Sequence, residues 1–506
     1  MNNTKYNRFR NASIFLMLFV FAIAISSCSK DNSTTKPTEQ NSSVGLIKVT
    51  GEDASAATKT ALNGVVTSWV DGDQVGIFSP QAKLTADGSI GVVNALFTAQ
   101  SSAISSSFNG TMYWGTGEHK FYAYYPYKSG VFEATAVPVS VPNEQTQSAA
   151  GNTDHIAALD FLVATPVTVA AGTNGDITNG INLRYNHLFS VLELNIIGNH
   201  AGRYIKAVDF GGPTGISFDG TIDITTEGSV STPNVPPGKG AVKVTLTNRA
   251  TITTTDTKIY LLFNPERYAG NWYSNLYFVK EDGTGFGSAT VVYKKEPSGG
   301  FVRGKKYKVI IGADISGEFY ECVTIGGQVW MTRNLLTTFY NDSDGSNNDI
   351  PKNENNPGGS ASWAGLTSGA YSIIDPGYGY FGHLYNGYAI NTEKLCPSGW
   401  HVPSKAEWTT MINILGGPNS ATANKMIESN ETYYWDPHNT AASNSSRFSA
   451  HGTGKRVAGD GSYTDNKLKG YWWTSDLKSV SIGPDGITFD DAPDPKSGFA
   501  VRCVKN

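Results

Sequence analysis

The stretch Cys396-Pro397-Ser398-Gly399-Trp400-His401-Val402-Pro403-Ser404-Lys405-Ala406-Glu407-Trp408 decides how the C-terminal part of the chain folds. The prolines and the glycine in its first half disfavour regular structure. Ser404 is then suited to cap a helix, and Glu407 three residues later completes a capping box. The two tryptophans are too large to leave exposed, so we expect them to hold the turn and the helix in one core. Cys396 can form a disulfide if the chain enters an oxidising compartment.

The composition bounds the fold class. A length of 506 residues leaves room for about three domains of ~150 residues each. Only 16% of the residues are charged, and 55 glycines and 25 tyrosines suit many short strands joined by turns. The net charge of -4 provides no basic surface for nucleic acid. We therefore expect a mainly β protein that does not bind nucleic acid.

The N-terminus has the pattern of an export signal. Basic residues precede an apolar run from Ile14 to Ile25, which is too short to span a bilayer and right for the hydrophobic part of a signal peptide. The run ends at Ile25-Ser26-Ser27-Cys28, which resembles a bacterial lipobox. The resemblance implies that residues 1–27 are removed and that Cys28 carries the acyl chains of a membrane anchor. The alternative is an ordinary secretory signal with a chance cysteine.

Residues 28–43 are rich in Ser, Thr, Asn and Lys, and we expect them to form a disordered, lipidated tether. The segment Ser29-Lys30-Asp31 resembles the short tags that direct some lipoproteins to the cell surface. The expected location is therefore the outer membrane at the cell surface.

A series of aromatic and β-branched segments follows the tether. In chain order they are Thr58–Leu62, Ser68–Phe78, Phe108–Gly110, His119–Tyr127, Asp160–Ala164, Leu183–Leu192 and Phe301–Ile311. In this order and spacing they resemble the fimbrillin family of Bacteroidales pilus subunits. The resemblance implies two transthyretin-like β-sandwich domains, which we expect at residues 44–180 and 181–314. It also implies donor-strand exchange, in which a neighbouring subunit supplies a missing strand.

In that family a protease that cuts after arginine removes the first strand. Val44–Val49 could be that strand here, and Lys59 lies where the cut would fall. No arginine occurs between Cys28 and Arg184, so cleavage by an arginine-specific enzyme is not expected. Whether residues 44–59 are removed stays open.

Residues 315–506 form a third unit around the opening stretch. Further motifs are Gly317–Leu335, Tyr380–Ala389, Gly470–Ser475 and Phe499–Val504. Together they resemble the major paralogous domain first described from Fibrobacter succinogenes, a relative of C-type lectins and of sulfatase-modifying folds. The resemblance implies an α+β, C-type-lectin-like domain whose last strand returns beside its first. It pairs Cys396 with Cys503 as the preferred disulfide, with Cys322–Cys503 as the alternative.

Five aromatic residues of this unit lie in segments rich in Asn, Gly and Pro. They are Trp363, Tyr378, Tyr433, Tyr434 and Trp435. Aromatic side chains on loops can stack on sugars or anchor a protein partner, so these are the candidate ligand-binding residues. The alternative is that they cover the core of a loop-rich domain.

Catalytic and metal motifs are absent from the sequence. It contains no nucleophile elbow, no His-Glu-x-x-His pair and no phosphate-binding glycine loop. Asp342-Ser343-Asp344-Gly345 suggests a calcium loop, but its glycine comes too early for an EF-hand. His383 and His401 belong to family motifs, and we expect them to be hydrogen-bonded rather than metal ligands. We predict no enzyme activity, no metal and no cofactor.

The resulting prediction is a cell-surface fimbrial subunit, placed at the tip because the chain after Ile311 continues into a folded domain rather than a free donor strand. Its partners would be other fimbrial subunits, through donor-strand exchange, and a glycan or protein ligand. The first alternative is a surface lipoprotein that captures glycan as a nutrient. The second is an enzyme of the sulfatase-modifying type, although the three remaining cysteines do not reproduce that family's reactive pair.

Overall fold

Strands predominate in the structure, a computed structural model, and the few helices are short. The chain is therefore mainly β, as its composition predicts. The structure describes residues 46–53, 68–169, 180–198, 202–212, 215–226, 229–230, 240–265, 272–293, 300–313, 319–342, 348–353, 363–374, 381–429, 434–437 and 439–506.

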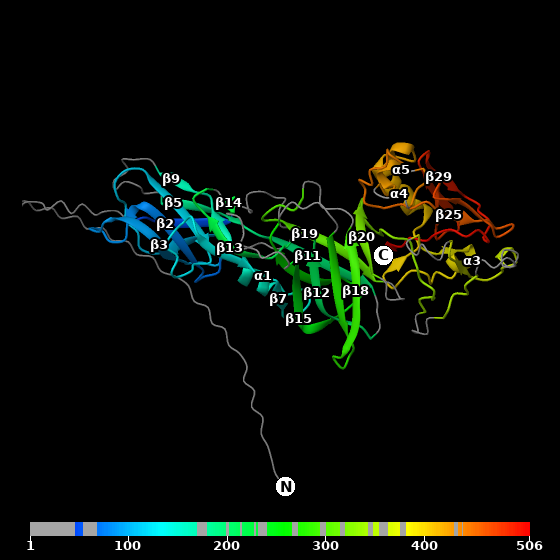
Figure 1. Ribbon diagram of the computed structural model, residues 1–506, viewed down its shortest axis with the longest axis horizontal. Coiled ribbons are helices and arrows are strands. Elements are labelled where there is room, and N and C mark those ends of the chain that lie inside the picture. The colour runs from blue at the N-terminus through cyan, green and yellow to red at the C-terminus, as the bar shows by residue number, and fades with distance from the viewer. Residues whose placement is uncertain are drawn as a thin grey trace, which may run out of the picture. The chain divides into compact units, whose positions relative to one another are not determined.

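The first sheet closes on itself and surrounds its own core (Figure 1, blue to cyan). Its strands are β1 (Val49–Asp53), β2 (Gln74–Lys83), β3 (Ile90–Ala99), β4 (Ser105–Asn109), β5 (His119–Tyr125), β8 (Leu162–Ala164), β9 (Val167–Val169) and β10 (Ile181–His187). Their order is β2-β3-β4-β1-β10-β8-β5-β9, and a further pairing of β2 with β5 closes the ring. The helix α1 (Asp154–Leu159) precedes β8.

Two further sheets pack face to face around a second core. One has the order β18-β17-β12-β15-β7 and the other β16-β11-β19-β20-β21-β30-β24. Their bounds are β7 (Glu144–Gln147), β12 (Tyr204–Gly211), β15 (Ala241–Thr251), β17 (Trp272–Val279), β18 (Gly285–Tyr293), β11 (Ser190–Gly198), β16 (Thr257–Phe263), β19 (Lys306–Ala313), β20 (Phe319–Ile325), β21 (Gln328–Met331), β24 (Trp400–His401) and β30 (Val504–Lys505). A small sheet joins β6 (Val137–Val141), β13 (Phe218–Asp223) and β14 (Ser229–Val230).

The sheets divide differently from the domains expected at residues 44–180 and 181–314. Strand β10 follows residue 180, yet it pairs with β1 and β8 in the first sheet. Strands β6 and β7 precede that residue and pair with β13 and β15 of the following half. Alternation of apolar and polar residues predicts that a segment is a strand but does not predict its partner strand. The sequence therefore could not show that strands on either side of residue 180 pair with each other.

The C-terminal part carries most of the helical residues (Figure 1, yellow to red). Its helices are α3 (Gly387–Ile390), α4 (Lys405–Leu415) and α5 (Ser420–Met426). Its remaining strands are β22 (Tyr371–Ser372), β23 (Leu384–Tyr385), β25 (Thr453–Arg456), β26 (Tyr463–Asn466), β27 (Gly470–Trp473), β28 (Ser479–Gly483) and β29 (Gly486–Asp490). The expected boundary between residues 314 and 315 is bridged, because β19 and β20 pair within one sheet.

Candidate functional site

Strand β1 is inserted between two strands that come much later in the chain. It runs parallel to β10 and antiparallel to β4. Its inward side consists of Ile47, Val49 and Gly51, all of them buried, with Ile47 just before the strand itself. Val49 pairs with Ile181 and Gly51 with Leu183. The strand begins later than the Val44–Val49 segment expected from the sequence, because Val49 is its first residue rather than its last.

The outward side of β1 is held by weak polar contacts. Thr50 is exposed and its hydroxyl donates to the backbone oxygen of Ile181 at 3.3 Å. Glu52 forms an ion pair with Arg184 at 2.7 Å, but the Arg184 side chain is 63% exposed. An exposed pair of this kind contributes at most about 1 kcal/mol. Strand β1 is therefore retained by its backbone ladder and by two aliphatic side chains.

Strand β19 likewise lies between two other strands, in the seven-stranded sheet that covers the second core. It pairs in parallel with β11 over its whole length and antiparallel with β20 over Ile310–Ala313. Ile311 faces the core between the two sheets, and Ile310 faces the core of the C-terminal part. Lys306 forms a buried ion pair with Glu193 of β11 at 2.7 Å. These contacts hold the second half of β19 on both edges and both faces, and its first half through β11 and the ion pair.

The helix cap in the opening stretch forms as its residues predict, but its two tryptophans do not share one core. Trp400 packs in the cluster around the disulfide, and Trp408 packs in the cluster around Trp330. Ser404 caps α4 and forms the capping box with Glu407. Burial alone would raise the pKa of the Glu407 carboxyl, but hydrogen bonds from Ser404 and from His401 outweigh it and lower that pKa. Trp408 is fully buried and packs edge-on against Trp330, with ring centroids 5.0 Å apart. This stretch is scaffold that positions the end of the chain.

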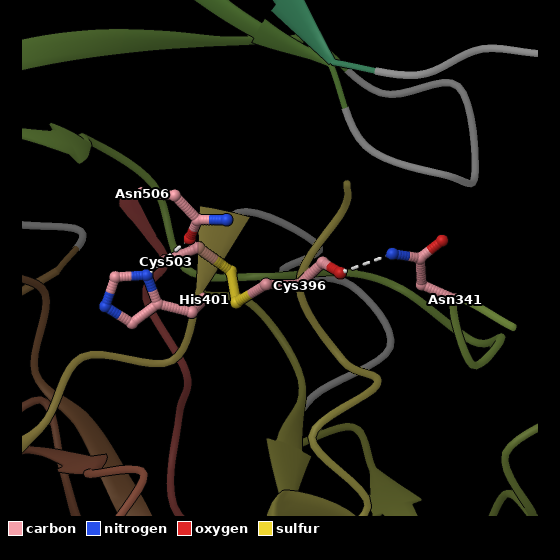
Figure 2. Close-up of a disulfide and its surroundings, with 5 residues drawn as sticks. All are labelled: Asn341, Cys396, His401, Cys503 and Asn506. Atoms are coloured by element: carbon pink, nitrogen blue, oxygen red, sulfur yellow. Dashed lines mark hydrogen bonds between the residues drawn. A yellow bond between two sulfur atoms is a disulfide. The ribbon is translucent and has the colours of Figure 1, made fainter. Parts of the chain in front are cut away.

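A disulfide joins Cys396 to Cys503 with an S–S distance of 2.05 Å, the pairing preferred from the resemblance (Figure 2). The backbone oxygen of Cys396 accepts a hydrogen bond from Asn341 at 3.0 Å. On the other side, Nδ1 of His401 lies 2.6 Å from the side-chain oxygen of Asn506 (Figure 2). Its Nε2 lies 2.9 Å from the Glu407 carboxylate. Both ring nitrogens of His401 are thus engaged by hydrogen bonds, consistent with a structural role.

Cys322 is a buried free cysteine on β20. It pairs with Met331 of β21, whose backbone N–H donates to the oxygen of Cys503. Strand β21 therefore separates Cys322 from Cys503, and the alternative Cys322–Cys503 disulfide is wrong. Burial raises the pKa of the Cys322 thiol, which keeps it protonated and unreactive.

The aromatic ligand site expected on the loops does not form as a surface. Trp363, Tyr434 and Trp435 are buried, with exposed fractions of 0%, 4% and 1%. Trp363 donates its indole N–H to the backbone of Lys496, and Trp435 donates to Ala450. These three residues belong to the core because their faces are covered by neighbouring side chains. Tyr378 and Tyr433 lie outside the described residues, as do Cys28, Lys59 and Asp344.

Asp342, the first residue of the expected calcium loop, already has partners. Its carboxylate accepts hydrogen bonds from the Lys394 ammonium at 2.7 Å and from the backbone of Asn348 at 3.0 Å. His383 stacks on Tyr371, and burial lowers its pKa to about 4. Within the described ranges no group of three or more His, Cys, Asp or Glu side chains could hold a metal ion. Those ranges also contain no helix long and apolar enough to cross a membrane.

A cavity of about 320 Å³ opens beside the first sheet. Trp69, Tyr125 and Leu162 form part of its wall, and Asp73 and Asp160 contribute carboxylates to it. Asp73 accepts a hydrogen bond from the Tyr125 hydroxyl at 3.2 Å, and Asp160 lies 2.6 Å from His187, outside the lining. Both carboxylates are therefore already hydrogen-bonded within the protein.

Sequence reasoning missed the role of Arg502. Its guanidinium is fully buried and donates to the side-chain oxygen of Asn334 at 2.8 Å and to the backbone oxygens of Phe448 and Ser449. Burial lowers its pKa to about 9, so it remains charged at neutral pH. An arginine between Val501 and Cys503, in an apolar segment just before β30, is the signal that could have identified it.

The sequence profile described as fimbrillin-like matches residues 57–319, which is more than half of the chain. The chain belongs to the fimbrillin-like family. A second profile, the Fibrobacter succinogenes major domain, matches residues 323–505. This fimbrillin-like protein has no match among curated proteins.

Several solved structures are similar to it. A candidate cell adhesion protein from Bacteroides uniformis is 18% identical, covering 56% of this chain and 98% of that one, with a TM-score of 0.35. A fimbrial protein from Bacteroides ovatus is 14% identical, covering 91% of this chain and 99% of that one, with a TM-score of 0.26. The fimbrial anchor protein Mfa2 from Porphyromonas gingivalis is 7% identical, covering 57% and 97%, with a TM-score of 0.28. The family assignment rests on the sequence match rather than on these similarities.

Proposed function

We propose that the protein is a cell-surface fimbrial subunit located at the tip of a filament. The observation that carries this proposal is the environment of β19, the closing strand of the family match. One edge is paired with β11 over all eight residues and the other with β20 over Ile310–Ala313, and the residues of this second half are buried. A strand held in this way is not available to complete a neighbouring subunit, so the protein accepts a strand without donating this one.

The accepting position in this proposal is that of β1. Strand addition gives affinity through backbone hydrogen bonds and specificity through pockets for alternate side chains. The gap between β4 and β10 would offer both if β1 left it. The two β-rich halves would then be the transthyretin-like domains of a strand-exchanging subunit, and removal of residues 44–59 would open the position.

The remaining parts of the proposal concern the two ends. Cys28 carries the lipid that attaches the protein to the outer membrane after residues 1–27 are removed. Residues 315–506 form a C-type-lectin-like domain that binds a glycan or a protein ligand. With Trp363, Tyr434 and Trp435 in the core, Tyr378 and Tyr433 remain the aromatic candidates for that contact.

Immunogold microscopy with antibodies against residues 315–506 tests the proposal. Label at filament ends is the expected result. Label along the filament shaft would contradict the tip position, and label spread over the membrane would favour the alternative, a lipoprotein that captures glycan. A strain producing the Cys28→Ala variant is the matched control, since it should lose the lipid anchor without any change in the folded part.

A further inference from the structure

Gly51, the last inward residue of β1 that the structure describes in full, faces two aromatic rings. A Cβ atom at this position would lie 2.6 Å from Cε2 of Phe108 and 3.0 Å from Cε2 of Tyr185. Real Cβ contacts essentially never fall below 3.0 Å, so even alanine would force a ring to move. The backbone of Gly51 does not require glycine, because its φ lies outside the left-handed region. The requirement comes from space alone.

The two rings are supported from behind by a third. Trp69 packs edge-on against Phe108 and against Tyr185, with ring centroids 5.0 Å apart in both pairs. Trp69, Phe108 and Tyr185 are called the aromatic trio below, and each is at most 6% exposed. Phe108 is also held by its place in β4, where it pairs with Val49 and with Ala99. Interiors this closely packed transmit a displacement rather than absorb it.

The other two inward positions, one just before β1 and one at its start, hold large aliphatic side chains instead of glycine. Ile47 and Val49 are 2% exposed and belong to the core of the first sheet. Lys48 and Thr50 point outward and are exposed. The groove therefore recognises one face of a strand, at spacing two, as aliphatic, aliphatic and glycine.

We infer that a strand taking the place of β1 must carry glycine opposite the aromatic trio. It must also carry aliphatic residues two and four positions before that glycine. This inference rests on the proposed function, which puts an incoming strand at β1. The partner it fits is an extended segment of another fimbrial subunit that runs parallel to β10. A segment with any larger residue at the glycine position is rejected by the trio.

The test uses the full chain with a site-specific protease sequence inserted between residues 53 and 68, cleaved so that β1 can leave. Fluorescent peptides with the sequence of residues 46–53 are added in excess, and bound peptide is measured by anisotropy. The unchanged peptide should bind. The Gly51→Ala peptide should bind about tenfold more weakly and the Gly51→Val peptide at least about 100-fold more weakly, the range expected for overpacking.

The matched control is the Lys48→Val peptide, which places the same side chain on the outward face. It should bind as well as the unchanged peptide. Valine favours strands more than glycine does, so without the aromatic trio the Gly51→Val peptide would bind more tightly. A Phe108→Ala protein should accept the Gly51→Val peptide at least about tenfold better than the unaltered protein does, because it provides the missing space.

The outcomes separate the two proposals. Equal binding of the unchanged and Gly51→Val peptides overturns the glycine requirement and leaves strand exchange at β1 standing. Failure of every peptide to bind, including the unchanged one, overturns strand exchange at β1 and the inference with it. Weak binding of the Gly51→Val peptide that Phe108→Ala does not relieve would place the cause outside the aromatic trio, and this too overturns the inference.

Discussion

Strands β1 and β19 have the same kind of neighbours but are held very differently. Each lies between a parallel partner and an antiparallel partner. Strand β1 pairs with β10 over five residues, whereas β19 pairs with β11 over eight, and the antiparallel ladders β1–β4 and β19–β20 both have four pairs. The ion pair beside β1 is exposed, and the one beside β19 is buried. The comparison indicates that one position is suited to exchange and the other to permanence.

The largest change in the free energy of unfolding should come from removing the disulfide of the C-terminal part. The Cys396→Ala/Cys503→Ala variant opens a link between residues 107 apart, and the free energy of unfolding should fall by about 4–5 kcal/mol. Denaturant unfolding measures this loss. Cys322→Ala is the matched control and should cost about 1 kcal/mol. Loss of amide protection at β19 in the double variant would show that its permanence depends on the disulfide rather than on its own pairing.

The next largest loss in the free energy of unfolding should come from breaking the buried ion pair beside β19. The Lys306→Met variant leaves the Glu193 carboxylate buried without its ammonium, which should lower the free energy of unfolding by about 3 kcal/mol. Thermal and denaturant unfolding measure this change. Replacing both residues, as Glu193→Leu/Lys306→Met, should recover most of the loss. If the single variant costs nothing, the charge pair does not contribute to holding β19.

The smallest effect should come from the exposed pair beside β1. The Arg184→Met variant should lower the free energy of unfolding by less than about 1 kcal/mol. Even that difference should vanish in about 1 M salt, because exposed charges are screened there. A loss as large as that of Lys306→Met would contradict the contrast between the two strands.

Local signals in the sequence were sufficient for some of these features. Ser404 and Glu407 identify a helix start because a capping box involves only neighbouring residues. The pairing of Cys396 with Cys503 followed from the family resemblance, which supplies the order of the strands. The two tryptophans of the opening stretch join different core clusters, which neighbouring residues alone do not determine.

Other features depend on contacts between distant residues, and the sequence could not supply them. Trp363 and Trp435 lie in segments with the composition of loops, yet both are buried, and the Trp363 indole donates to Lys496, 133 residues along the chain. Gly51 is one of 55 glycines, and only the register of β1 brings it to Phe108. Composition predicts where the chain turns but not which ring lies opposite which backbone.

The pairing of β19 with β20 has a mechanical consequence. A pull applied to the C-terminal part would enter the rest of the protein through a ladder of backbone hydrogen bonds as well as through the covalent chain. The contact between Lys505 and Asp256, at 3.1 Å, adds a second connection at the end of the sheet. Tension would therefore spread over several strands at once rather than pass through the covalent chain alone.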